Sequence, residues 1–106
     1  ISNNNNITNV DGLSSLVSVD YYLWIRYNDG LTDVDGLSSL NSVAGDFVLE
    51  HNDALADIDG LSSLNSVGGD LEIDQNPNLC QSEVDAFVTG VTVSGLVSTH
   101  DNDDNC

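Results

Sequence analysis

Basic residues are almost absent from this sequence. Arg26 is its only Lys or Arg, against 18 Asp and Glu, and the formal net charge at pH 7 is −17. A chain this acidic repels other polyanions, so nucleic acid and anionic membrane surfaces are excluded as partners. Cations, neutral glycans and basic proteins stay compatible with the charge.

Long apolar runs are missing as well. A helix that crosses a membrane needs about 20 consecutive apolar residues, and no stretch of the 106 residues provides them. We therefore expect no membrane insertion. The length allows one core of modest size, so we expect residues 1–106 to form a single domain.

One phrase occurs three times in the chain. VDGLSSL or IDGLSSL stands at residues 10–16, 34–40 and 58–64, and the match extends through three full repeats of 24 residues, 10–33, 34–57 and 58–81. Residues 1–9 match the second half of a repeat. Such a half coil leaves an apolar edge uncovered, so we expect further sequence upstream, or another chain, to cover this end.

Apolar residues recur at fixed places in each repeat. The segments 23–28, 47–52 and 71–76 largely alternate inward apolar residues with outward residues, which predicts a short strand with one buried face. Stacked coils then form a parallel sheet, and the sequence predicts a mainly β, right-handed solenoid. Asn28, Asn52 and Asn76 end the three strands, where their amides can bond the next coil in a ladder. In the second repeat the apolar residues are Val34, Leu37, Leu40, Val43, Phe47, Leu49 and Leu55.

The C-terminal region, residues 82–106, departs from the repeat. Ser82 as N-cap and Gly90 as a stop predict a short capping helix. After it, VTVSGLVSTHDN resumes the strand phrase at an offset of 26 residues, so that Val97 matches Leu71 and Asn102 matches Asn76. One last coil should therefore close the stack.

The same offset of 26 residues carries Cys80 onto Cys106. Residues on adjacent coils lie roughly 4.8 Å apart, which is within the reach of a disulfide. We expect the two cysteines to be bonded, and the protein to reside in an oxidising compartment. Two reduced structural cysteines are the alternative.

The pattern LxSLxxVxGDLxIxxNxxL, filled by residues 37–55 and again by 61–79, resembles the leucine-rich repeats of the receptor L-domain type. These repeats occur in bacterial and fungal cell-surface proteins. The resemblance covers nearly the whole chain and implies extracellular recognition, adhesion or architecture, without catalysis. A fold-level resemblance identifies no ligand.

Candidate binding residues lie on the outward face of the predicted strands. Trp24 and Arg26 project from the same strand, and an aromatic residue beside an Arg is typical of a contact surface. The candidate ligand-binding residues are Tyr22, Trp24, Arg26, Glu50 and His51. Trp24 could equally pack on its neighbours, and Arg26 with Glu50 could form an ordinary cross-strand ion pair.

Three aspartates, Asp11, Asp35 and Asp59, recur at one coil position and should stack roughly 5 Å apart. Like charges at that distance repel. Either each Asp accepts backbone N–H groups in its own Asp-Gly turn, or a hard cation such as calcium bridges the carboxylates. The three residues are therefore candidate metal ligands, with calcium as the candidate ion.

Residues for catalysis are few. His51 and His100 lie two coils apart, no Ser, His and Asp converge, and both cysteines are assigned to the disulfide. We therefore expect no enzyme. The sequence favours an extracellular or cell-surface binding or adhesion module with a protein or glycan ligand. The alternative is a structural subunit, in which copies of the chain assemble into an extracellular filament or surface layer.

Overall fold

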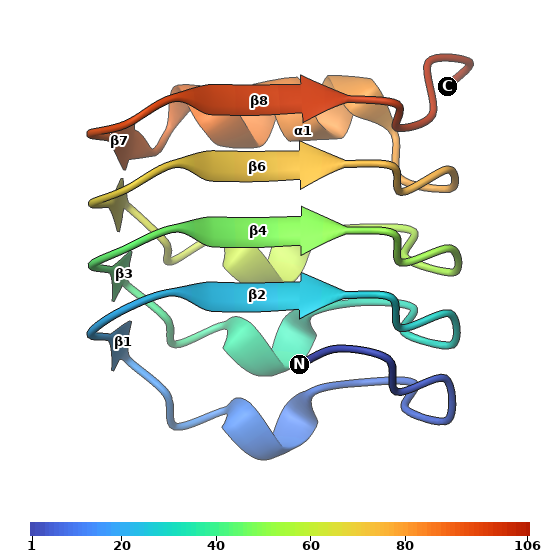
Figure 1. The fold of residues 1–106 in the computed structure, drawn as a ribbon, viewed down its shortest axis with the longest axis horizontal. Helices are drawn as coiled ribbons and strands as arrows, with labels where there is room; N and C mark the ends of the chain where they lie inside the picture. Colours follow the sequence, from blue (N-terminus) through green and yellow to red (C-terminus); the bar gives the residue numbers. More distant parts are fainter.

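The computed structural model describes residues 1–106 as a stack of similar coils (Figure 1). The main sheet has four parallel strands: β2 (Leu23–Arg26), β4 (Phe47–Glu50), β6 (Leu71–Asp74) and β8 (Val97–His100). Leu23 lies opposite Phe47, Phe47 opposite Leu71, and Leu71 opposite Val97. The predicted mainly β solenoid and its 24- and 26-residue registers are confirmed.

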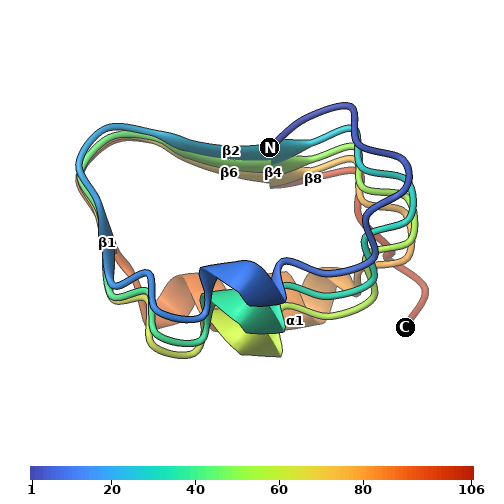
Figure 2. The ribbon, with the colours of Figure 1, turned by 90° about the horizontal axis from the view of Figure 1, so that it is seen from below.

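A second parallel sheet, which the sequence did not predict, runs beside the first. Its strands are β1 (Ser18–Val19), β3 (Ser42–Val43), β5 (Ser66–Val67) and β7 (Thr92–Val93). In Figure 2 the coils superimpose as one flattened outline, with the main sheet along one long side and the β1 column at one end. A two-residue strand shows no alternation of apolar and polar residues, so periodicity could not reveal it.

Short 3-10 helices form the long side opposite the main sheet. They are η1 (Asp11–Leu13), η2 (Asp35–Leu37) and η3 (Asp59–Leu61). The Gly in the middle of the second and third Asp-Gly-Leu meets the coil before it: a Cβ on Gly36 would overlap the carbonyl of Val10, and one on Gly60 the carbonyl of Val34. Close stacking of backbones therefore requires glycine there.

The core fills the space between the main sheet and the 3-10 helices. Ile25, Leu49 and Ile73 point inward from successive strands and are fully buried. Burial of these apolar side chains is the main favourable contribution to stability. Because the strands pair in register, the outward residues of successive coils line up in rows on one face of the main sheet.

The predicted asparagine ladder is present at the end of the strands. The Asn28 amide donates to Asn52 Oδ1 at 3.2 Å, Asn52 to Asn76 Oδ1 at 3.4 Å, and Asn76 to Asn102 Oδ1 at 3.2 Å. The residue before each of these asparagines has a positive φ of 52–57°. This left-handed residue turns the chain so that the Asn side chain points into the molecule.

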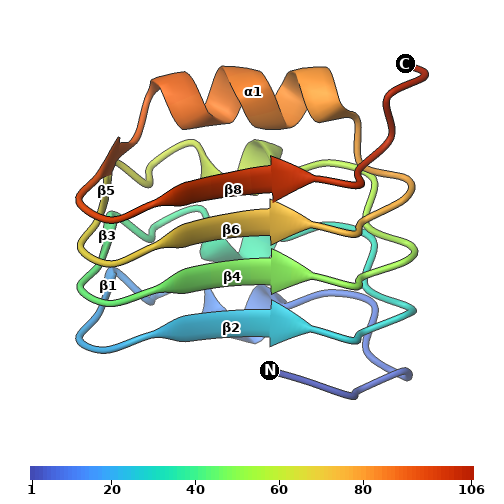
Figure 3. The same ribbon diagram turned by 45° about the horizontal axis from the view of Figure 1, so that its top comes forward.

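Helix α1 (Gln81–Thr89) takes the place of a 3-10 helix in the last coil (Figure 3). Gly90 ends it as predicted, but Ser82 is not its N-cap. The helix begins one residue earlier, after the extended Cys80, and no side chain caps it. Ser82 Oγ instead lies 2.9 Å from Cys80 Sγ, because Ser82 is already inside the first turn.

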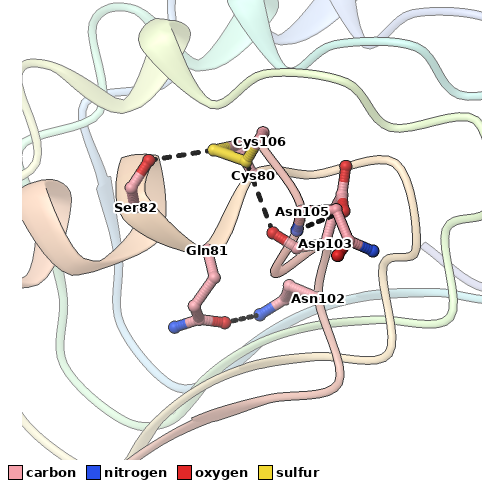
Figure 4. Close-up of a disulfide and its surroundings, with 7 residues drawn as sticks. All are labelled: Cys80, Gln81, Ser82, Asn102, Asp103, Asn105 and Cys106. Carbon is pink, nitrogen blue, oxygen red and sulfur yellow. Dashed lines mark hydrogen bonds between the residues drawn. A yellow bond between two sulfur atoms is a disulfide. The ribbon is translucent and has the colours of Figure 1, made fainter.

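The predicted disulfide joins Cys80 and Cys106, whose Cα atoms lie 5.8 Å apart (Figure 4). It ties the start of α1 to the C-terminal end of the chain. Beside it, the Asn102 amide donates to Gln81 Oε1 at 2.9 Å. Helix α1 and the 3-10 helices are all too short to cross a bilayer.

Candidate functional site

The outward face of the main sheet carries most of the candidate residues. Because the strands are parallel and in register, Arg26, Glu50, Asp74 and His100 form one row across β2, β4, β6 and β8. The residues of this row are basic, acidic, acidic and titratable basic in that order. The face therefore changes in character from the β2 edge to the β8 edge.

At the β2 edge, the only Arg lies over the ring of the only Trp, and the three Tyr of the chain are close to them in the sequence. We call Tyr21, Tyr22, Trp24, Arg26 and Tyr27 the aromatic patch. The Tyr22 and Trp24 ring centroids lie 4.6 Å apart, and the Arg26 guanidinium carbon lies 4.5 Å from the Trp24 ring centroid. Tyr21 is 80% exposed and Tyr22 58%. The patch holds the sole Trp and all three Tyr of the chain.

The stacking geometry explains why a large residue is tolerated at Tyr21 in this coil. Tyr21 and Gly45 hold equivalent positions, and a Cβ on Gly45 would overlap the Tyr21 carbonyl of the coil before it. Tyr21 comes just before β2, the edge strand of the main sheet. Its large side chain is therefore free to point outward, whereas the later coils need glycine there.

The predicted binding residues separate into two neighbouring groups. Trp24 contacts both Tyr22 and Arg26, and Arg26 Nη1 lies 3.5 Å from Glu50 Oε1. The predicted ion pair is therefore present. His51 belongs to the next corner, where its ring stacks on Tyr27 with centroids 4.5 Å apart. Sequence reasoning did not place Tyr21 in the site; its exposure depends on its position in the outermost coil.

The middle of the row forms a sheet carboxylate cluster of Glu50, Glu72 and Asp74. Their carboxylate oxygens lie within 4.8 Å of one another. Asp74 is only 1% exposed, although it points away from the core, because neighbouring side chains cover it. Its Oδ2 lies 3.4 Å from His100 Nε2, and its buried Oδ1 has no hydrogen-bond partner. Burial, with the neighbouring Glu72, raises the pKa of Asp74 to about 6.

A second group of acids, the helix carboxylate cluster, comprises Asp57, Asp59 and Glu83. Their oxygens also lie within 4.8 Å of one another. Glu83 accepts the Ile58 N–H at 2.9 Å. Burial raises the pKa of Glu83 and this hydrogen bond opposes the rise. The cluster borders an open pocket of about 480 Å³ between η3 and α1, lined also by Ala86 and Phe87.

The aspartates predicted as a metal ladder occupy equivalent positions of η1, η2 and η3. Of these three aspartates, only Asp59 belongs to one of the two carboxylate clusters, the helix carboxylate cluster. Repulsion by Asp33 raises the pKa of Asp35, with smaller contributions from burial and from Asp57, Asp11 and Asp59.

The expected hydrogen bonds of this ladder are made by other residues. The side chains of Asn9, Asp33 and Asp57, two residues before each ladder Asp, accept the N–H groups of Asp11, Asp35 and Asp59 at 3.0, 3.0 and 3.3 Å. No backbone N–H donates to the carboxylates of Asp11, Asp35 and Asp59, so the alternative in which each accepts such groups in its own Asp-Gly turn was wrong. The side chain of the earlier residue reaches the N–H first, as in an Asx turn.

Comparison with protein-family models, with curated proteins and with solved structures finds no match to this chain. The two carboxylate clusters could each hold an ion. Together with the aromatic patch, they are the features from which function can be argued.

Proposed function

We propose that this protein is a non-catalytic binding or adhesion module of the extracellular space or cell surface, and that the aromatic patch is its contact surface. The observation that carries the proposal is the contact of the only Trp with both Tyr22 and the only Arg of the chain, next to the exposed Tyr21. Trp, Tyr and Arg are the residue types that dominate the binding energy of interfaces.

The patch is held ready for binding before any partner arrives. Arg26 lies over Trp24 and is also paired with Glu50 at 3.5 Å. Tyr27 is fixed against His51. Side chains that are already ordered lose little entropy on binding, which favours affinity.

The surroundings limit the partner to a protein or a glycan. The net charge of −17 opposes acidic partners at long range, and flat exposed rings suit either sugar faces or apolar side chains. The disulfide supports an extracellular address, since such bonds persist in oxidising compartments. The leucine-rich-repeat resemblance supports the same role, and the acidic surface makes calcium a fitting accompanying ion.

Titration of the intrinsic fluorescence of Trp24 against panels of neutral glycans and extracellular proteins tests the proposal. A ligand of the patch should change this emission. In calorimetric titration, which does not need the indole, the double variant Trp24→Ala, Arg26→Ala should bind that ligand at least tenfold more weakly, as hot-spot losses do. The control is Ser98→Ala. Ser98 lies on β8, three strands away from Trp24 in the same row. Equal affinity of the double variant and the control would disprove the role of the patch.

The second candidate is the structural subunit, in which copies assemble end to end. It is favoured by the open end of the stack, where Leu96 is 77% exposed and β8 has a free edge. Tyr21 opposes the simplest form of assembly, because a coil like the later ones stacked on it would meet its side chain. Ordered fibres in electron micrographs of the purified protein would favour assembly, and dispersed monomers the binding module.

A further inference from the structure

We propose that Glu50, Glu72 and Asp74 form a binding site for a hard divalent cation of the calcium type on the outer face of the main sheet. The site is distinct from the aromatic patch, and its existence does not depend on the proposed function. It also differs from the ladder of Asp11, Asp35 and Asp59 predicted from the sequence.

The strands bring the three ligands together without any loop movement. Glu50 and Asp74 lie opposite each other on β4 and β6, and Glu72 precedes Asp74 by two residues on the same face. Their carboxylate oxygens fall within 4.8 Å of one another. Ligands on rigid neighbouring strands define a site more sharply than ligands on loops do.

One oxygen of this cluster is buried and has no hydrogen-bond partner. Asp74 Oδ1 is buried and accepts no hydrogen bond, and the Asp74 side chain is only 2% exposed. Buried polar atoms without a partner are rare in folded proteins and unfavourable. A cation between the three carboxylates would supply the missing partner.

The helix carboxylate cluster has the same number of acids but no such atom. Glu83 accepts the Ile58 N–H at 2.9 Å, and Asp57 accepts the Asp59 N–H at 3.3 Å. No carboxylate oxygen of this cluster is both buried and unpartnered. It therefore serves as a natural control for acidity alone.

The donor atoms select the class of ion. Three carboxylates offer only oxygen, and both cysteines are closed in the disulfide, so no thiolate is available for soft metals. Calcium accepts such oxygen ligands in flexible geometry and completes its shell with water. His100 faces Asp74 with Nε2, while its Nδ1 lies 2.8 Å from Asp101 Oδ2. This ring is a positioning group that holds Asp74 from the β8 side.

In the absence of a metal ion, a proton shared between Glu72 and Asp74 would reduce the repulsion in the cluster. Two basic groups also lie beside it: Arg26 Nη1 is 3.5 Å from Glu50 Oε1, and His100 Nε2 is 3.4 Å from Asp74 Oδ2. The two possibilities make different predictions. A cluster that serves only to share a proton shows no saturable calcium binding even at a pH where that proton has left, whereas a cation site binds one ion per chain.

Isothermal titration of CaCl2 into the intact protein, at constant and high ionic strength, tests the site. We expect one ion per chain with a Kd of about 10⁻⁴ to 10⁻³ M, the range of extracellular calcium modules. Glu72→Gln keeps the shape and should weaken binding at least tenfold, because it removes one of the three charged ligands. Glu83→Gln, which removes the same charge from the other cluster, should leave binding unchanged.

Terbium luminescence then locates the ion. Tb³⁺ occupies calcium sites and emits when a nearby indole is excited. Glu72 lies two strand spacings, roughly 10 Å, from Trp24 in register. The emission should disappear on addition of CaCl2 and in Glu72→Gln, and persist in Glu83→Gln. Absence of calcium binding in the natural sequence, binding of Zn²⁺ alone, or equal weakening by the two Gln variants would overturn the proposal.

Discussion

Buried asparagine side chains bond each coil to the next at the end of the main strands. Asn52 shows the pattern: its Oδ1 accepts the Asn28 N–H at 3.2 Å, and its amide donates to the Ile25 carbonyl at 3.0 Å. No smaller or apolar side chain can replace both bonds. A single Asn therefore satisfies backbone groups of two turns in the interior, where water cannot reach them.

Replacing Asn52 with Ala should lower the free energy of unfolding by about 3 kcal/mol, because several buried donors and acceptors lose their partners. Denaturant unfolding measures the loss. Asn4→Ala is the matched control at the exposed end of the ladder, where the Asn4 amide bonds only Ser2. We expect a loss there below about 1 kcal/mol. Similar losses in the two variants would contradict the ladder as a major source of stability.

The burial of Asp74 makes stability depend on pH in the calcium-free protein. Its pKa is raised from 3.8 to about 6 by burial and by Glu72 and Glu50, against the opposing effect of His100. The folded state therefore holds a proton that the unfolded state has released, and the free energy of unfolding falls as the pH rises from about 4 through 6. A pKa change of this size corresponds to roughly 2–3 kcal/mol.

Thermal melts in chelator between pH 4 and 8 should show this fall, and Asp74→Asn should make it smaller while raising the melting temperature at pH 7.5. The Asp101 hydrogen bond raises the pKa of His100. Its protonation therefore also stabilises the fold at acidic pH, in both proteins. An unchanged pH profile in Asp74→Asn would show that other carboxylates cause the dependence.

The secondary-structure elements divide into those that periodicity reveals and those that it cannot. The four main strands, the last helix and the register of Cys80 on Cys106 could be predicted, because repetition fixes them even where single residues are ambiguous. The second sheet could not, since its strands have two residues each. The start of α1 at Gln81 also escaped prediction, because the chain enters the helix from the extended Cys80 without a side-chain cap.

Glycine at the middle of the 3-10 helices controls how closely the coils stack. Gly36→Ala should lower the free energy of unfolding by about 2 kcal/mol or more, because its Cβ would overlap the carbonyl of Val10 and force the backbones apart. Gly12→Ala is the same change at the same coil position, with nothing within 4 Å. Its stability should stay within about 1 kcal/mol of the natural protein.

Comparison of the two alanine variants by denaturant unfolding measures this contribution of stacking. Since both changes affect the conformational freedom of the unfolded chain equally, the difference between them reports the folded state alone. A Gly36→Ala variant as stable as Gly12→Ala would show that the coils have room to separate.

The disulfide ties the last coil to the start of α1 and should stabilise it. It closes a loop with a sequence separation of 26 residues, for which the loop-entropy relation gives about 3 kcal/mol. Reduction, or the double variant Cys80→Ser, Cys106→Ser, should lower the melting temperature by at least about 10 °C. Melts with and without reductant measure this. A variant that melts as the oxidised protein does would show that the last coil needs no bond.

At the scale of the whole molecule, the net charge of −17 acts against the compact state. Salt screens such repulsion over about 10 Å at 0.1 M and about 3 Å at 1 M. The melting temperature should therefore rise by several degrees between 20 mM and 1 M NaCl. Asp35→Asn should reduce this rise, since the pKa of Asp35 is raised by four neighbouring aspartates. No change with salt would mean that local hydrogen bonds already offset the repulsion.

The candidate sites could be predicted only in part. Alternation placed Trp24, Arg26 and Glu50 on one face, and the register then made them neighbours. It could not show that neighbouring side chains cover Asp74, because exposure depends on the conformations of the residues around it. The hydrogen bonds of the ladder aspartates likewise depend on which side chain reaches a given N–H group, that of the ladder Asp or that of the Asn or Asp two residues before it.

The two ends of the chain lie at opposite ends of the stack, and only the C-terminal coil is closed by a covalent bond (Figure 1). Under tension between the ends, the coils should peel away one at a time from the N-terminal side. Each released coil would lengthen the tether by roughly 80 Å, the extended length of 24 residues. The disulfide would carry the force past the residues between Cys80 and Cys106, so these would not be stretched. The chain should therefore lengthen in steps and stop short of its full contour length.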